Sequence, residues 1–188
     1  HYIPFDPRCK RIQFNEVYRP AFLLLREQKI QMEPLKNIFS RALAERIAQD
    51  VRAVHPDFSD SKFLAFVFDA QWESLELKQR VRHISNCLRK VLPAGYKKAL
   101  EVLLKVVHGY IEKYGEKMTF EYMFLPDFVE THGVEFPDQS IKAFETITRW
   151  CSAEFAVRPF LIRYPERMYA QMLEWSKHPS PLVRRLSS

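Results

Sequence analysis

Glu154 and Arg158 form the local pattern in this chain that could carry chemistry. The carboxyl group stands among apolar residues, from Trp150 to Phe160, and the arginine follows four positions later, so both would lie on one face of a helix. Two structural interpretations compete for this pattern. Glu154 comes two residues after Ser152, which can cap a helix. An acidic residue in the first turn of a helix interacts favourably with the helix dipole and stabilises the helix by about 0.3 to 1 kcal/mol. Alternatively, the two residues form an i, i+4 ion pair worth about 0.2 to 0.5 kcal/mol, and spacing alone favours these structural interpretations.

Other catalytic and metal-binding patterns are missing from the sequence. The six histidines never stand four positions apart, and no two of the three cysteines have C-x-x-C spacing, so we predict no metal site. No G-x-S-x-G, G-x-x-x-x-G-K-[ST] or G-x-G-x-x-G can be written, and a Ser/His/Asp or Cys/His triad is not readable from sequence. An odd number of distant cysteines argues against a disulfide framework and favours a reducing, cytoplasmic setting.

The elements that must position these residues are predicted to be helices. Only four glycines occur among 188 residues, so the chain has few tight turns for strands, and an all-α architecture is favoured. Apolar residues repeat with helical spacing in segments that prolines and glycines separate. The predicted helices cover residues 34–55, a short segment after Ser59, 73–92, 94–108 with Gly109 as C-cap, 126–131, 138–150, 152–164 with Pro159 inside, 165–177 and 180 onward.

Helices joined by short connectors indicate stacked antiparallel helix pairs. An internal echo supports this arrangement, because residues 80–85 and 182–187 share a V-R-x-[IL]-S core at the start of a predicted second helix. Such V-R openings after a short turn resemble the inner helices of HEAT repeats, which have a period of about 40 residues. The predicted fold is therefore an all-α, HEAT-like helical repeat solenoid.

Basic residues are concentrated in two blocks. The formal net charge of +6 is too small to identify a nucleic-acid binder by itself. Residues 76–117 carry a net charge of +6 and residues 149–188 carry +4, on either side of an acidic block, residues 118–148, with −5. In a curved solenoid the inner helices share one face, so the blocks would align into a strip for phosphates; the alternative is that they solvate outer helix faces. The candidates are Arg82, Arg89, Lys90, Arg149, Arg158, Arg163, Arg184 and Arg185.

Two sequence blocks resemble the AlkC-type branch of the AlkC/AlkD DNA alkylation repair glycosylases. One is A-E-F-A-V-R-P-F at residues 153–160, and the other is H-P-S-P-L-V-R-R-L-S at residues 178–187. The openings M-E-P-L-K-N-I-F-S at Met32 and E-L-K-Q-R-V-R-H-I-S at Glu76 are similar to the same branch. The resemblance covers about residues 32–188, and the helices between these blocks are generic.

This resemblance implies an enzyme that grips duplex DNA on a concave basic face. It would remove a cationic alkylated base, such as N3-methyladenine or N3-methylcytosine, by cleaving the N-glycosidic bond without a metal or an organic cofactor. Glu154 matches the family position for the carboxylate that stabilises positive charge on the deoxyribose and orients the attacking water. DNA contacts are assigned to Arg82, Arg149, Trp150, Arg158, Arg163, Arg184 and Arg185, with Trp150 packing on a deoxyribose unless it belongs to the core.

The resemblance also sets expectations for the ends of the chain. Met32 reads as a native start, and residues 1–31 as an N-terminal extension without a counterpart in the family. The family pattern continues past residue 187 into a second acidic residue and further repeats. Residues 32–188 are therefore expected to be a truncated alkylation-repair domain, weakly active or inactive alone, from a full-length glycosylase.

Two further expectations concern partners and the alternative function. We expect a monomer in the cytoplasm without a membrane segment, because the longest apolar runs are far shorter than the ~20 residues that a span requires. The alternative to an enzyme is a helical-repeat scaffold that binds nucleic acid or protein without catalysis.

Overall fold

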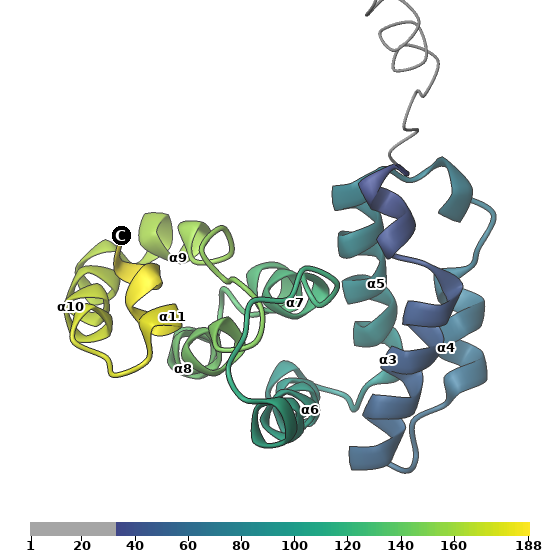
Figure 1. Ribbon diagram of the computed structural model, residues 1–188, viewed down its shortest axis with the longest axis horizontal. Coiled ribbons are helices and arrows are strands. Elements are labelled where there is room, and N and C mark those ends of the chain that lie inside the picture. The colour runs from purple at the N-terminus through teal and green to yellow at the C-terminus, as the bar shows by residue number, and fades with distance from the viewer. Residues whose placement is uncertain (1–32) are drawn as a thin grey trace, which may run out of the picture. The chain divides into compact units, whose positions relative to one another are not determined.

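Helices account for every regular element in residues 33–188, which are the residues that this computed structural model describes (Figure 1). The predicted all-α class is therefore confirmed for this part of the chain. In chain order the elements are η1 (Leu35–Ile38), α3 (Arg41–Val54), α4 (Asp60–Val67), η2 (Trp72–Ser74), α5 (Leu77–Val91), α6 (Tyr96–Tyr114), α7 (Phe124–His132), α8 (Pro137–Thr148), α9 (Arg158–Arg163), α10 (Pro165–Ser176), α11 (Pro181–Arg184) and η3 (Arg185–Ser187). None of these helices is long and apolar enough to cross a membrane. The predicted extension, residues 1–31, lies outside the described residues.

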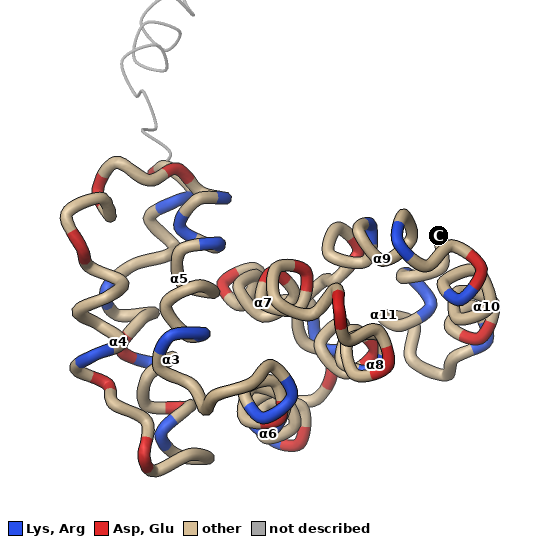
Figure 2. Tube along the Cα trace, turned by 180° about the vertical axis from the view of Figure 1, so that it is seen from behind, with Lys and Arg blue, Asp and Glu red and all other residues tan. Residues whose placement is uncertain are grey.

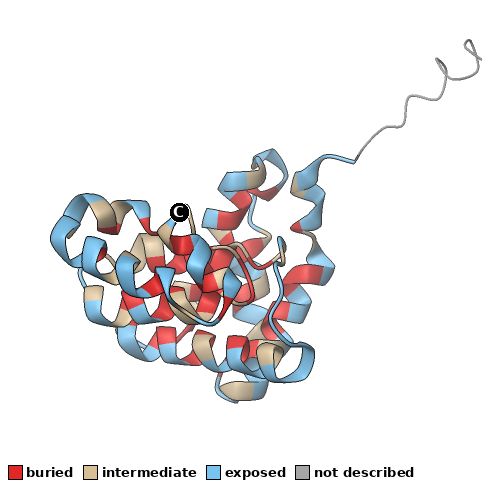
Figure 3. Cartoon of the chain, turned by 60° about the vertical axis from the view of Figure 1, so that its left-hand side comes forward, coloured by how far each residue is buried: buried red, intermediate tan, exposed pale blue. Residues whose placement is uncertain are grey.

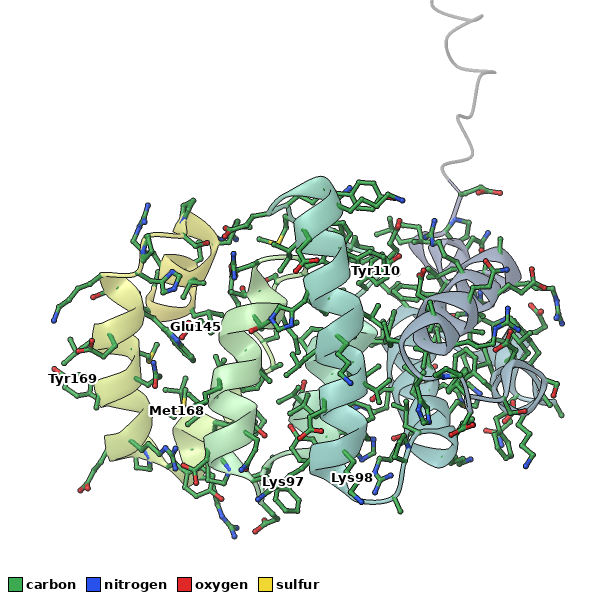
Figure 4. The ribbon with its side chains drawn as sticks, turned by 90° about the horizontal axis from the view of Figure 1, so that it is seen from below. Lys97, Lys98, Tyr110, Glu145, Met168 and Tyr169 are labelled. Atoms are coloured by element: carbon green, nitrogen blue, oxygen red, sulfur yellow. The ribbon has the colours of Figure 1, made fainter. Side chains whose placement is uncertain are left out.

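Most consecutive helices pack on one another, with α5 and α6 and α8 and α9 as the exceptions, and the helices stack into two layers. Helix α6 packs against α3 and α8, while α7 packs against α5 and α8. Viewed from below, α6, α8 and α10 run nearly parallel in one row (Figure 4). The opposite layer contains α5 and α7, which pack on each other, and it continues with α9 (Figure 1). This is the predicted stack of helix pairs.

One continuous core runs between the layers. It is built from fully buried aromatic residues that come from successive helices, including Phe63 of α4, Phe128 of α7, Phe144 of α8 and Trp175 of α10. Figure 3 shows the buried residues gathered along the inner faces of the helices. Because burial of each large aromatic side chain is worth roughly 1.5 to 3 kcal/mol, this core fixes how the connectors between helices are presented.

Serine side chains define where several helices begin. Ser59 accepts a hydrogen bond from the Lys62 backbone N–H, which confirms it as the predicted cap of α4. Ser180 does the same for the Val183 N–H at the start of α11. At Glu76, a capping box with Gln79 begins α5, so the predicted helix 73–92 is divided into η2 and α5.

The predicted C-cap at Gly109 is wrong, because α6 continues to Tyr114. Tyr110 and Ile111 pack against the core in the additional turn, and this packing outweighs the cost of a glycine inside a helix, which is about 1 kcal/mol. The helix ends at Gly115, whose N–H bonds to the Ile111 carbonyl at 2.9 Å. Its φ of 74° and ψ of −179° suit glycine alone.

The predicted helix 152–164 is also shorter than expected. Residues 154–157 form turns, and only Arg158–Arg163 are α-helical. Pro159 stands in the first turn of α9, where its missing N–H removes no helical hydrogen bond, so it does not act as a kink inside a longer helix. Tyr164, with φ of −133° and ψ of 56°, leaves the helical region before Pro165 and ends α9. Glu154 therefore lies in a connector rather than on a helix face.

Candidate functional site

Glu154 is presented by a turn whose neighbouring side chains are anchored in the core. Ala153, Ala156 and Val157 are buried, and the Ser152 hydroxyl accepts a hydrogen bond of 3.4 Å from the Glu154 backbone N–H. Small buried residues on both sides bring the backbone close to the core, because their side chains need little room. The turn thus holds Glu154 at a defined place between α8 and α9.

The partner of the Glu154 carboxylate is Arg185 of η3. Arg185 Nη2 lies 2.7 Å from Glu154 Oε1, and the two side chains are 54% and 35% exposed. Oε1 itself is shielded from solvent and accepts no hydrogen bond of ordinary geometry from the described residues, so the contact is an ion pair held by charge. The Glu154–Arg158 ion pair that the spacing favoured is not formed; the Arg158 guanidinium lies 4.6 Å over the Phe155 ring instead.

Arg185 comes from a short C-terminal segment that is itself well anchored. Val183 and Leu186 are buried on either side of it, and Ser180 caps the segment. The neighbouring Arg184 donates hydrogen bonds of 2.8 Å to the carbonyls of residues 178 and 179, so its guanidinium is turned back on its own loop. Of the two adjacent arginines, Arg185 is therefore the one that reaches the Glu154 turn.

The connector between α6 and α7 runs beside the end of α8, which leads into this turn. The Lys117 and Thr119 backbone N–H groups donate to the carbonyls of Arg149 and Trp150 at 3.0 and 2.9 Å. Glu116 accepts hydrogen bonds from Ser180 Oγ at 2.5 Å and from Arg149 Nε at 2.7 Å. The Ser180 hydroxyl, with the Arg149 guanidinium, holds the pKa of the Glu116 carboxyl below its ordinary value. Glu116 thus ties the α6–α7 connector to both flanks of the candidate site, and it engages Arg149.

Trp150 lies in the core rather than on the surface. It is 3% exposed and stacks on Tyr110 with ring centroids 4.9 Å apart. Lys117 Nζ lies 4.8 Å from the indole ring. The core interpretation of Trp150 therefore replaces the expectation that it packs on a deoxyribose, because the groups stacked on the indole leave almost none of it accessible.

Two more of the predicted DNA contacts are engaged by carboxylates of the acidic block. Arg82 Nε lies 2.9 Å from both carboxylate oxygens of Asp127, and its Nη2 lies 3.4 Å from Glu130. Arg163 pairs with Glu135 at 3.4 Å. Figure 2 accordingly shows acidic positions interspersed with basic ones along the trace. The acidic block thus neutralises part of the predicted basic strip within the molecule.

A cleft of about 840 Å³ brings some of these residues together. Its walls come from α5, α7 and the segment 152–162, and they include Arg82, Arg158 and Phe155. Phe155 is 60% exposed although the small residues around it are buried. Phe155 was not among the site residues predicted from sequence, because a phenylalanine in an apolar run is usually buried in the core. The one feature of the sequence that could have indicated its exposure is its position directly after Glu154.

Comparisons with known proteins show what the chain is similar to. No protein-family model matches the chain. The uncharacterized protein YhaZ of Bacillus subtilis (strain 168) is 37% identical over 157 residues, which cover 84% of this chain and 42% of YhaZ. The alkylpurine DNA glycosylase AlkC of Pseudomonas fluorescens, solved bound to DNA containing an abasic site analog, matches with a TM-score of 0.73 and 32% identity over 82% of this chain and 41% of AlkC. The chain has the helical-repeat fold of AlkC. It spans about two-fifths of the length of both proteins.

Proposed function

We propose that this chain belongs to an AlkC-like DNA glycosylase, which binds duplex DNA and hydrolyses the N-glycosidic bond of a cationic N3-alkylated base. The observation that carries the proposal is the joint similarity of sequence and fold to AlkC, an alkylpurine DNA glycosylase. N3-methyladenine is the base to test first, because it is an alkylpurine; N3-methylcytosine is the second.

The chemistry of such a substrate suits a carboxylate as the catalytic group. Alkylation gives the base a positive charge, so it leaves readily and needs little protonation. The barrier then depends on positive charge that develops on the deoxyribose, and a fixed carboxylate stabilises that charge. Glu154 is anchored by its turn, is only partly solvated and could also orient the attacking water.

The arginines around the Glu154 turn supply the contacts to phosphate in this proposal. Arg158 follows Glu154 by four residues, and Arg185 forms an ion pair with it. Arg82 lies in the same cleft as Arg158. A guanidinium can give two parallel hydrogen bonds to a phosphate, which an ammonium cannot, so arginine suits this role. The remaining candidates are Arg149, Arg163 and Arg184.

An excision assay tests the role of Glu154. Duplex DNA with one N3-methyladenine is incubated with the native protein, in the length that the cell makes, and with its Glu154→Gln variant. We expect base release by the native protein and a loss of at least tenfold in the variant, because glutamine keeps the shape but removes the charge that opposes the sugar cation. Release of the free base is measured by chromatography.

A matched control distinguishes the effect of removing the Glu154 charge from the effect of removing any negative charge. Glu166→Gln removes an exposed carboxylate in the first turn of α10, and we expect it to leave excision unchanged. Equal rates for the native protein and Glu154→Gln would remove Glu154 from the mechanism. Salt-dependent DNA binding without any excision by the native protein would instead favour the non-catalytic scaffold.

A further inference from the structure

The pairing of Glu154 with Arg185 poses a problem for the proposed catalysis. A carboxylate 2.7 Å from a guanidinium forms a nearly neutral unit, and a neutral unit stabilises a developing sugar cation far less than a free carboxylate does. In the free protein, therefore, the charge of the candidate catalytic carboxylate, Glu154, is largely neutralised by Arg185. The following inference rests on the proposed function and concerns what separates Arg185 from Glu154.

We propose that Arg185 is a positioning residue that exchanges Glu154 for a DNA backbone phosphate when duplex DNA binds. In the free protein the guanidinium neutralises the Glu154 carboxylate, while the turn itself holds the residue in place. On DNA the same guanidinium moves to a phosphate oxygen, and the carboxylate regains its full charge at the moment when the sugar arrives. Binding and activation are thereby coupled through one side chain.

The geometry of the pair makes this exchange easy. Both side chains are partly exposed, and ion pairs between partly exposed side chains contribute little to stability. Glu154 Oε1 accepts no hydrogen bond of ordinary geometry from the described residues, so departure of Arg185 breaks a contact between charges and no directional hydrogen bond. A phosphate offers the guanidinium two oxygens and can accept two parallel hydrogen bonds.

The surroundings leave Arg185 free to move while the rest of the site stays fixed. Its backbone is held between the buried Val183 and Leu186, and Arg184 is fastened to its own loop. The Glu154 turn is anchored by buried neighbours. Only the Arg185 side chain, 54% exposed, has to change its rotamer for the exchange.

A double-mutant cycle on binding to undamaged duplex DNA tests the exchange in this chain, and it needs no catalytic activity. Glu154→Gln removes the competitor for the guanidinium, so we expect affinity to rise about two- to fivefold, the value of an exposed ion pair. In an Arg185→Ala background the same Glu154 substitution is expected to change affinity by less than 1.5-fold. Arg185→Ala alone should reduce the slope of log K against log salt by about 0.9, which is one phosphate.

Controls distinguish the exchange from general effects of charge or folding. Arg167→Ala removes an arginine of α10 that pairs with Asp138, and it should leave the coupling between positions 154 and 185 unchanged. Arg185→Gln serves as the second variant if Arg185→Ala does not fold, as monitored by circular dichroism. A salt slope unaltered by both Arg185 substitutions, or a gain from Glu154→Gln that persists without Arg185, would overturn the exchange. Absence of binding by every variant would overturn the proposed function itself.

Discussion

Glu116 shows how one side chain can set the geometry of the candidate site. Its carboxylate accepts hydrogen bonds from Ser180 at 2.5 Å and from Arg149 at 2.7 Å, and so connects the residues before α7, the end of α8 and the start of α11. No sequence motif announces this contact, because the partners stand 33 and 64 positions away. Only the packing of the three helices makes them neighbours.

Replacing Glu116 by glutamine is expected to lower stability by about 1 kcal/mol near pH 7, since the hydrogen bonds lose their charge while part of the group remains solvated. Ser180, with Arg149, depresses the pKa of Glu116 below its ordinary value of 4.5. The stabilising contribution is therefore complete above about pH 4.5 and is lost as pH falls through the folded-state value. Thermal melts of both proteins should differ by about 2 to 4 °C at pH 7 and converge in acid. Glu174→Gln, at an exposed position of α10, is the control, and a difference independent of pH would contradict the prediction.

At the scale of elements, helix positions followed from sequence better than helix ends. Apolar spacing located α4 after the predicted cap Ser59, and the helix start predicted at Ser180 agrees with α11. The prediction that the helix ends at Gly109 was wrong because glycine is frequent at helix ends but does not force one when the residues after it can pack on the core. Here Tyr110 and Ile111 find the core, so α6 passes through Gly109 and stops at Gly115.

Two alanine substitutions test this correction with opposite signs. Gly109→Ala should stabilise the protein by about 0.5 to 1 kcal/mol, because this position is helical and an added methyl group meets no atom within 4 Å. Gly115→Ala should destabilise it by about 1 to 3 kcal/mol, because its φ of 74° and ψ of −179° strain any other residue. Urea unfolding measures both, and a destabilising Gly109→Ala or a stabilising Gly115→Ala would contradict this assignment of the helix end.

At the scale of the molecule, the distribution of charge matters more than its sum. Residues 32–188 carry a net charge of only +3, and several arginines of the two basic blocks are paired with carboxylates. Apart from the Arg149–Glu116 pair, which Ser180 helps to hold, these partly exposed pairs are each weak, so phosphates can replace the carboxylates at little cost. Binding to DNA should therefore be governed by exchange of partners among arginines rather than by a preformed strip of free charge.

A fluorescence titration of this chain with alkylated and with plain duplexes checks this view. We expect binding to both, with log K falling linearly as log salt rises and with a slope steeper than −1, which corresponds to at least two phosphate contacts. A neutral polymer of similar size is the control for non-specific quenching. Binding that does not depend on salt, or no binding to either duplex, would contradict a role for these arginines.

The sequence by itself determined the helical class and the order of the helices, because apolar periodicity and a low glycine content are visible without any tertiary contact. Glu154 became the candidate carboxylate through a local motif that resembles the AlkC-type branch, since its spacing to Arg158 alone favoured a structural role. The tertiary structure alone decided which groups meet. Arg185 reaches Glu154 across 31 residues, Trp150 turns into the core against Tyr110, and Arg82 is paired with Asp127. The physical reason is that partners distant along the chain are chosen by how whole helices pack, and this packing is not encoded in any single segment.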